Sequence, residues 1–404
     1  MESTPSSDIQ KAQNRSKLYC VLFIYSLCFL MGLNEPSYEI VKRMGELDPN
    51  AIEFTLGDYF SFVGPLVACL LVNYFNLRVT CITTLSLYIA AYVLAFFKSV
   101  PVLFLIANLI HFLADGICDT FLMSACCLLF LGNKSALLMC MLSFCYGFGN
   151  TFKLPLIDWI SSVFPASYIG VFIVFIVFYI FALVTAFFID FSIPCFTKGK
   201  ESNVGIKKSL TIPMTYISGI TLGICTFVEL NSKQGPQTYL QDRYGVDVDN
   251  FYQTFVIFFT ISRLVSGYFL DLIGHLRSMV ITLVIVFICT LIGMILKSNG
   301  FWAFIVNGFF VAIIWPVYYT VIMDIYKNDV MVPATVVYVI NSVIVSLSML
   351  LYSYVYNLNP LVGVHLNLVF CIVGIACVLF NQWIFKKRDA KKPEFNQFMQ
   401  PLTA

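Results

Sequence analysis

Three side chains capable of acid–base chemistry lie inside an apolar segment, 101–131, that is long enough to cross a bilayer. They are His111, Asp115 and Asp119. A spacing of four and eight residues places them on one face of a helix, and a carboxylate at bilayer depth costs at least ~2.5 kcal/mol to insert. That face should therefore meet protein or water and serve proton coupling or polar binding. The alternative is that these groups only hold one helix against its neighbours.

The composition of the chain is that of a polytopic membrane protein. Hydrophobic residues make up 59% of its 404 residues and charged residues only 11%, values that soluble proteins do not show. Its net charge of +2 gives no basic surface for nucleic acid. The chain has no H-E-x-x-H motif and no serine paired with one of its three histidines, so no enzyme is expected. The 14 cysteines lack C-x-x-C and zinc-ligand spacing and should pack as small apolar residues, without a cofactor or resident metal.

About twelve apolar segments have the length of a membrane span, and they predict an all-α membrane protein. The polar segment 192–210 separates the first six from the last six. Two six-helix bundles joined by a linker are typical of transporters that alternate access between two repeats. The predicted spans are 17–41, 54–75, 79–97, 101–131, 136–164, 167–190, 211–239, 250–273, 278–297, 300–326, 331–357 and 362–385.

Charge distribution predicts the orientation of the chain. Lysine and arginine are concentrated in the tails, in the central linker and in alternate loops, and short basic loops stay on the cytosolic side of a membrane. We therefore expect both termini to be cytosolic, in a monomer located in the plasma or inner membrane. The predicted parts are an N-terminal tail, a first bundle, a linker, a second bundle and a C-terminal tail, at 1–16, 17–191, 192–210, 211–386 and 387–404.

The end of the predicted eighth span carries glycines and charges at a regular spacing: Gly267, Asp271, Gly274 and Arg277. Glycine allows close helix approach, an aspartate stabilises a helix N-terminus, and an arginine can pair across a cytosolic gate. This pattern resembles the loop motif of the major facilitator superfamily. The resemblance implies the major facilitator fold and a gating role for these four residues and for Arg263.

Further stretches resemble the fucose-permease branch of that superfamily, whose members transport sugars with protons. They are Leu33-Asn34-Glu35-Pro36, Gly116-Ile-Cys-Asp119-Thr120, and Trp315-Pro316-x-x-Tyr319-Thr320. The resemblance implies that Glu35 and Asp119 carry proton coupling. The residues themselves point the same way, because an acid at bilayer depth favours its protonated form, although Glu35 could instead lie hydrated at the outer mouth.

Lys153 lies in the middle of the predicted fifth span, where a lysine keeps its charge only beside an acid. We therefore expect it to pair with Asp115 or Asp119. Gly235-Pro236 should interrupt the seventh span and expose backbone groups to substrate, unless this stretch is the outer end of an ordinary helix. The candidate substrate-binding residues are Tyr146, Asn150, Gln234, Gln237, Asn307, Trp315 and Asn341.

Together these features predict a secondary active transporter that moves a small polar metabolite, with a sugar as the first candidate, by alternating access and with protons. One alternative is a divalent-metal transporter in which His111, Asp115 and Asp119 supply nitrogen and oxygen ligands; another is a transporter of a different organic solute. A third is a receptor that uses the fold without transport. The expected partners are the small-molecule substrate, protons and the lipid bilayer.

Overall fold

The computed structural model describes residues 7–34, 40–41, 62–130, 135–164, 168–191, 205–246, 248–327, 330–359 and 362–390, and these residues form helices joined by short connections. The helices before the central polar segment are α1 (Ser7–Leu33), α4 (Val63–Tyr74), α5 (Leu77–Ala95), α6 (Pro101–Leu129), α7 (Ser135–Val163) and α8 (Tyr168–Phe188). A short helix, α10 (Ile206–Thr211), begins in the predicted linker and ends one residue beyond it.

The helices after α10 follow the predicted spans closely. They are α11 (Pro213–Tyr244), α12 (Val248–Ile273), α13 (His275–Leu296), the 3-10 turn η1 (Lys297–Gly300), α14 (Phe301–Val311), α15 (Ile314–Tyr326), α16 (Met331–Leu358) and α17 (Val362–Ala390). Among the described residues, ten stretches are long and apolar enough to cross a membrane, and the longest, His275–Tyr326, contains α13 and the α14–α15 pair. With the shorter apolar helix α4, the described helices give twelve crossings, as predicted.

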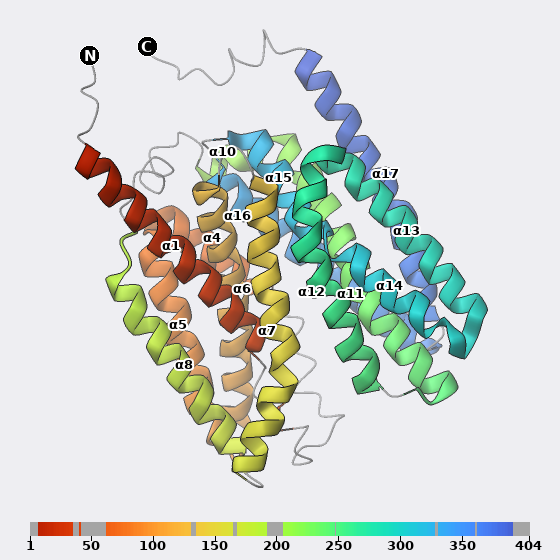
Figure 1. Ribbon diagram of the computed structural model, residues 1–404, viewed down its shortest axis with the longest axis horizontal. Coiled ribbons are helices and arrows are strands. Elements are labelled where there is room, and N and C mark those ends of the chain that lie inside the picture. The colour runs from red at the N-terminus through yellow and green to blue at the C-terminus, as the bar shows by residue number, and fades with distance from the viewer. Residues whose placement is uncertain are drawn as a thin grey trace.

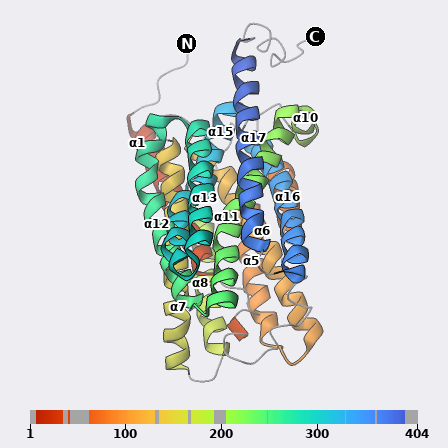
Figure 2. The same cartoon turned by 90° about the vertical axis from the view of Figure 1, so that its right-hand side faces the viewer.

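The two sets of helices form the two sides of one molecule. Figure 1 shows α5 and α8 at one edge and α13 and α17 at the opposite edge, with α6, α7, α11 and α12 between them. α1 begins and α17 ends at the same end of the molecule (Figures 1 and 2), as an even number of crossings requires. Along the junction, α7 packs against α12, and α16 packs against α4 and α6.

The tenth span, predicted as one helix over 300–326, is broken. α14 ends at Val311 and α15 begins at Ile314. The proline at position 316 explains this difference, because it has no N–H to donate to the carbonyl of Ala312, four residues earlier. That carbonyl instead accepts a hydrogen bond of 3.2 Å from Nε of Arg263, a buried side chain on α12.

The sequence allowed two interpretations of Gly235-Pro236, a break in the seventh span or the outer end of an ordinary helix, and the structure contradicts the break. α11 continues through both residues to Tyr244. Pro236 has no N–H to donate to the carbonyl of Ser232, four residues earlier, and transmembrane helices tolerate a proline of this kind without a break.

Glycines set the distance between several helix pairs. A Cβ atom on Gly32 in α1 would lie 2.0 Å from the carbonyl oxygen of Tyr146, and one on Gly149 in α7 would lie 2.2 Å from that of Phe29. In α11, Gly219 and Gly223 meet α16 in the same way, since a Cβ on either would lie 2.6 Å from an isoleucine side chain. The backbones of these helices are therefore in contact.

We expect Gly149→Leu to destabilise the protein strongly, because the new side chain meets backbone atoms of α1 that cannot rotate away. Overpacking of this kind costs about 1–3 kcal/mol or more. Thermal melting of the purified variant measures the effect. Gly205→Ala is the matched control, since nothing lies within 4 Å of a Cβ at that position; equal melting temperatures for the two variants would show that α1 and α7 are not in contact.

Candidate functional site

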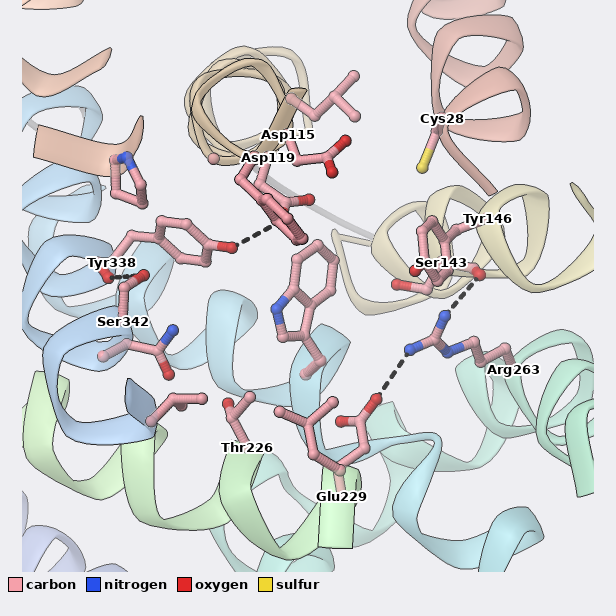
Figure 3. A pocket seen from close by; sticks show the side chains of 18 residues that line it. Cys28, Asp115, Asp119, Ser143, Tyr146, Thr226, Glu229, Arg263, Tyr338 and Ser342 are labelled. Carbon is pink, nitrogen blue, oxygen red and sulfur yellow. Dashed lines mark hydrogen bonds and ion pairs between the residues drawn. The ribbon is translucent and has the colours of Figure 1, made fainter. Parts of the chain in front are cut away.

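A cavity of about 270 Å³ lies between the two sets of helices, close to the lower end of the range of roughly 300–1,000 Å³ for small-molecule sites. Its wall comes from α1, α4, α6 and α7 on one side and from α11, α12, α15 and α16 on the other (Figure 3). The lining residues are Cys28, Pro65, Phe112, Asp115, Gly116, Asp119, Leu122, Ser143, Tyr146, Thr226, Glu229, Leu230, Arg263, Trp315, Tyr338, Asn341, Ser342 and Val345.

Asp119 occupies the wall of this cavity on α6. It is half-buried, and its Oδ2 accepts a hydrogen bond of 2.8 Å from the hydroxyl of Tyr338 on α16 (Figure 3). Gly116, one turn earlier, lets α4 approach, because a Cβ on the facing Gly64 would lie 2.7 Å from the Cα of Gly116. The acid is therefore held at the junction, with its described hydrogen-bond partner on the opposite side of the molecule.

Asp115 lines the same cavity but is fixed from behind by the first set of helices. Its Oδ1 accepts from the hydroxyl of Tyr88 at 2.5 Å and from Nδ2 of Asn34 at 2.9 Å. The oxygen of the Asn34 amide accepts from Tyr92 at 2.9 Å. These bonds orient the carboxylate, whose side chain is 29% exposed.

His111 lies behind Asp115 and is completely buried. The rings of Tyr88 and Tyr92 meet it edge-on at 5.5 and 5.4 Å between centroids. Because the amide oxygen of Asn34 accepts from Tyr92, its NH₂ group faces Nε2 of His111 at 2.9 Å. The structure thus brings His111 and Asp115 together at 3.6 Å, but only Asp115 reaches the cavity.

The opposite wall is organised by an ion pair. Nη2 of Arg263 in α12 lies 3.2 Å from Oε1 of Glu229 in α11. Nη1 of the same arginine donates to the carbonyl of Ser143 in α7 at 2.9 Å (Figure 3), and its Nε donates to the carbonyl of Ala312. One guanidinium therefore joins both sides of the junction and the break between α14 and α15. The resemblance implied a gating role for Arg263, and the structure places it in the wall of the central cavity.

Aromatic rings complete the wall. Trp315, at the start of α15, is partly exposed and packs edge-on against Tyr319 at 4.9 Å between ring centroids. Tyr146 in α7 lies with its ring centroid 5.8 Å from Cζ of Arg263. Trp315, Tyr146 and Asn341 were all predicted to meet substrate, and all three line the cavity.

Four other predicted substrate-binding residues are not among the residues that line the cavity. Asn307 is fully buried in α14, where its amide donates to Thr290 at 2.8 Å. Asn150 accepts from the hydroxyl of Tyr252 at 3.0 Å and so joins α7 to α12. Gln234 and Gln237 lie further along α11. The predicted break in α11 was the reason for expecting them at the site, and α11 has no such break.

Lys153 was expected to pair with Asp115 or Asp119, and the ion pairs of the described residues include none between it and either acid. Its Nζ lies 6.0 Å from the centroid of the Tyr252 ring, on α12. Among the described residues, the two acids accept hydrogen bonds instead from tyrosine and asparagine side chains. The spacing of charged residues in the sequence does not identify these uncharged partners.

Two predicted residues cannot be placed in full: Glu35 lies outside the described residues, and so does the side chain of Asp271 in α12. Gly267 packs α12 against α7, because a Cβ atom at this position would lie 3.0 Å from the Cβ of Cys140. Gly274 has φ +90° and joins α12 to α13, a backbone conformation that glycine adopts without strain. Arg277 lies exposed in the first turn of α13, beside a surface hollow that Asp324 and Lys327 also line.

Several residues that support the cavity were not predicted to have a role of their own. Asn34, Tyr88 and Tyr338 donate hydrogen bonds to the two aspartates, and Tyr92 donates to Asn34. A usable signal existed for Glu229, because an arginine in the middle of an apolar span must find a counter-ion inside the protein.

Comparisons with known proteins agree with this architecture. The sequence model of the Major Facilitator Superfamily matches residues 50–327 and 236–403. No curated protein sequence matches the chain. A crystal structure of FucP in the outward conformation superposes with a TM-score of 0.74 at 14% identity, covering 91% of this chain and 99% of that one.

Two other solved structures have the same fold. A variant of the E. coli fucose:proton symporter FucP gives a TM-score of 0.76 at 13% identity, over 91% of this chain and 98% of that chain. The human organic anion transporter MFSD10 gives a TM-score of 0.66 at 12% identity, over 93% of this chain and 100% of that chain. At these identities the likeness concerns the fold.

Proposed function

Because the chain belongs to the Major Facilitator Superfamily, we propose that it is a secondary active transporter that moves a small polar metabolite with protons, through the cavity between its two sets of helices. A sugar is the first candidate for the substrate. The observation that carries this proposal is Asp119, a half-buried acid in the cavity wall whose Oδ2 bonds to Tyr338 across the junction.

Asp119 has the two properties that coupling by alternating access requires. It lies in a cavity that can hold substrate, so its proton and the substrate can affect one another. Its hydrogen-bond partner is on the opposite helix set, so a change in its charge alters an interaction that must rearrange when the two sets move. Asp115, fixed by Asn34 and Tyr88, supplies a second carboxylate nearby.

The sugar assignment rests on the cavity and on the fold neighbours. FucP, which has this fold, is a fucose:proton symporter, and the cavity here combines a tryptophan face with carboxylate, amide and hydroxyl groups. Aromatic faces and hydrogen-bonding groups suit the two faces of a sugar ring. MFSD10 is an organic anion transporter with the same fold, so the chemistry of the cavity has to decide between these substrate classes.

The metal alternative receives no support from the part of the chain that the structure describes. There, no group of three or more histidine, cysteine or acidic residues is arranged to hold an ion. His111 is directed to Asn34, and Asp119 to Tyr338, so the three predicted ligands do not converge.

A ligand screen on the purified protein tests the proposal. A substrate that binds the folded state raises its apparent melting temperature by mass action. We expect stabilisation by one or more monosaccharides, followed by counterflow of the same compound in proteoliposomes. Stabilisation without counterflow would instead support a receptor, and stabilisation only by divalent metal ions would contradict the sugar assignment.

The proposed gate gives a separate expectation. We propose that Asp271 and Arg277, at the turn between α12 and α13, control the interconversion of inward-open and outward-open states. Asp271→Asn and Arg277→Ala should each slow counterflow severalfold and leave the equilibrium Kd for substrate nearly unchanged. Loss of binding in a folded variant would contradict a gating role. Lys207→Ala, in the exposed helix α10 at the same end of the molecule, is the control for a loss of basic charge.

A further inference from the structure

The wall formed by α11 and α16 has a feature that the proposed coupling does not use: an excess of hydrogen-bond acceptors. Oε2 of Glu229 and Oδ1 of Asn341 are buried and have no hydrogen-bond partner among the residues that the structure describes. Both residues line the cavity, and Asn341 is only 3% exposed. A buried acceptor without a donor is energetically unfavourable, so these atoms favour a ligand that donates to them.

Two hydroxyl groups on the cavity wall share this property. Oγ of Ser143 and Oγ1 of Thr226 are buried without a partner, and both residues line the cavity. Thr226 and Glu229 are three residues apart on α11, so they are neighbours on one helix face, and Figure 3 shows them side by side. Hydroxyls can donate or accept, so they adapt to a ligand whose position is set by the two acceptors.

The charge of the lining favours the same kind of ligand. Among the described lining residues, the acids are Asp115, Asp119 and Glu229, and the base is Arg263. The arginine is already engaged by Glu229, by the carbonyl of Ser143 and by that of Ala312. An anion entering the cavity would therefore meet three acidic side chains and a cation whose charge is largely compensated.

We propose that Glu229, Asn341 and Thr226 form a binding subsite for a ligand group that donates hydrogen bonds and carries no negative charge, a hydroxyl group in a sugar or an ammonium group in an amine. This inference rests on the proposed transport function, and it makes the cavity selective against organic anions. Trp315 lies in the same cavity and packs against the apolar part of such a ligand.

A test that needs no known substrate uses charged thiol reagents. Ser342 lines the cavity and is accessible to a small extent, at 9% exposure, and Ser162 is exposed at the end of α7. Ser342→Cys and Ser162→Cys, each in a Cys28→Ser background, are labelled with cationic and anionic methanethiosulfonates of equal size. Mass spectrometry reports labelling at the introduced cysteine. At each position the labelling rate of the cationic reagent is divided by that of the anionic reagent. The quotient at position 342, divided by the quotient at position 162, measures the charge selectivity of the cavity.

We expect this normalised ratio to be about tenfold or more in favour of the cation, and to fall severalfold when Glu229→Gln is added. A ratio near one, or faster labelling by the anion, would overturn the subsite. If Glu229→Gln does not fold, the ratio in the parent protein still decides the question.

A second experiment, with ligands, distinguishes failure of the proposed subsite from failure of the proposed transport function. Thermal shifts are measured with glucose, glucosamine and glucuronate, which share one ring and differ in charge. Stabilisation by the neutral or cationic compound and not by glucuronate supports both proposals. Cation-selective labelling without stabilisation by any of the three supports the subsite and contradicts the sugar assignment, and stabilisation by glucuronate alone overturns the subsite.

Discussion

Asp119→Asn should abolish accumulation of substrate driven by a proton gradient while leaving binding and counterflow detectable. A fixed neutral amide resembles the protonated acid, so the cavity can still bind substrate, but the side chain can no longer gain and lose a proton in each cycle. Oδ1 of the asparagine can accept the bond that Tyr338 donates to the acid, so the fold should be retained. Uptake into proteoliposomes with and without an inward proton gradient measures the effect.

Asp158→Asn is the matched control, because it makes the same chemical change at an exposed position of α7 that is not among the residues lining the cavity. It should leave gradient-driven accumulation unchanged. Unaltered accumulation in Asp119→Asn would show that the coupling proton is carried elsewhere, with Glu35 as the next residue to test. A partial loss in Tyr338→Phe, which removes the donor and retains the ring, would show that the bond across the junction contributes to coupling.

Arg263→Leu should be the most destabilising single change in the cavity. The side chain of Arg263 is 5% exposed, and its guanidinium pairs with Glu229 at 3.2 Å. Removing one partner of a buried ion pair leaves the charge of the other uncompensated, at a cost of about 3–5 kcal/mol. The change also frees the carbonyls of Ser143 and Ala312. Thermal melting of Arg263→Leu, Glu229→Gln and the double variant forms a cycle that isolates the interaction between the two side chains.

The double variant should melt at a higher temperature than Arg263→Leu alone, because the charge left behind has been removed. Additivity of the single effects within about 0.5 kcal/mol would show that the two side chains do not interact. Arg243→Leu, at an exposed position in the last turn of α11, controls for the loss of an arginine and should change the melting temperature little.

The fold was predictable because membrane insertion leaves few choices. Apolar segments of span length must be helices, so the lengths of α5, α6, α7 and α16 followed from hydropathy alone. Prolines were the exception. Pro316 and Pro236 both remove a backbone donor, yet only the tenth span is interrupted near its proline. The difference depends on partners from other helices, such as Arg263 at the carbonyl of Ala312.

The site was predictable where one helix face determines it and less so where two helices must meet. Asp115 and Asp119 reach the cavity together because they are four residues apart on α6. The pairing of Lys153 and the cavity position of Arg263 depended on how α7 and α12 face their neighbours, which sequence spacing does not encode. Intramembrane charge indicated that each group needs a partner, but neutral partners such as Tyr338 and Asn34 carry no comparable signal.

The central claim is that the cavity couples substrate movement to protons, and uptake against a gradient tests it most directly. Proteoliposomes containing the wild-type protein are given an inward proton gradient and a labelled panel of hexoses that includes fucose. We predict accumulation of at least one sugar above its external concentration, its loss when a protonophore dissipates the gradient, and its absence with Asp119→Asn. Sugar uptake that only equilibrates across the membrane, at the same rate with and without the proton gradient, would contradict coupling.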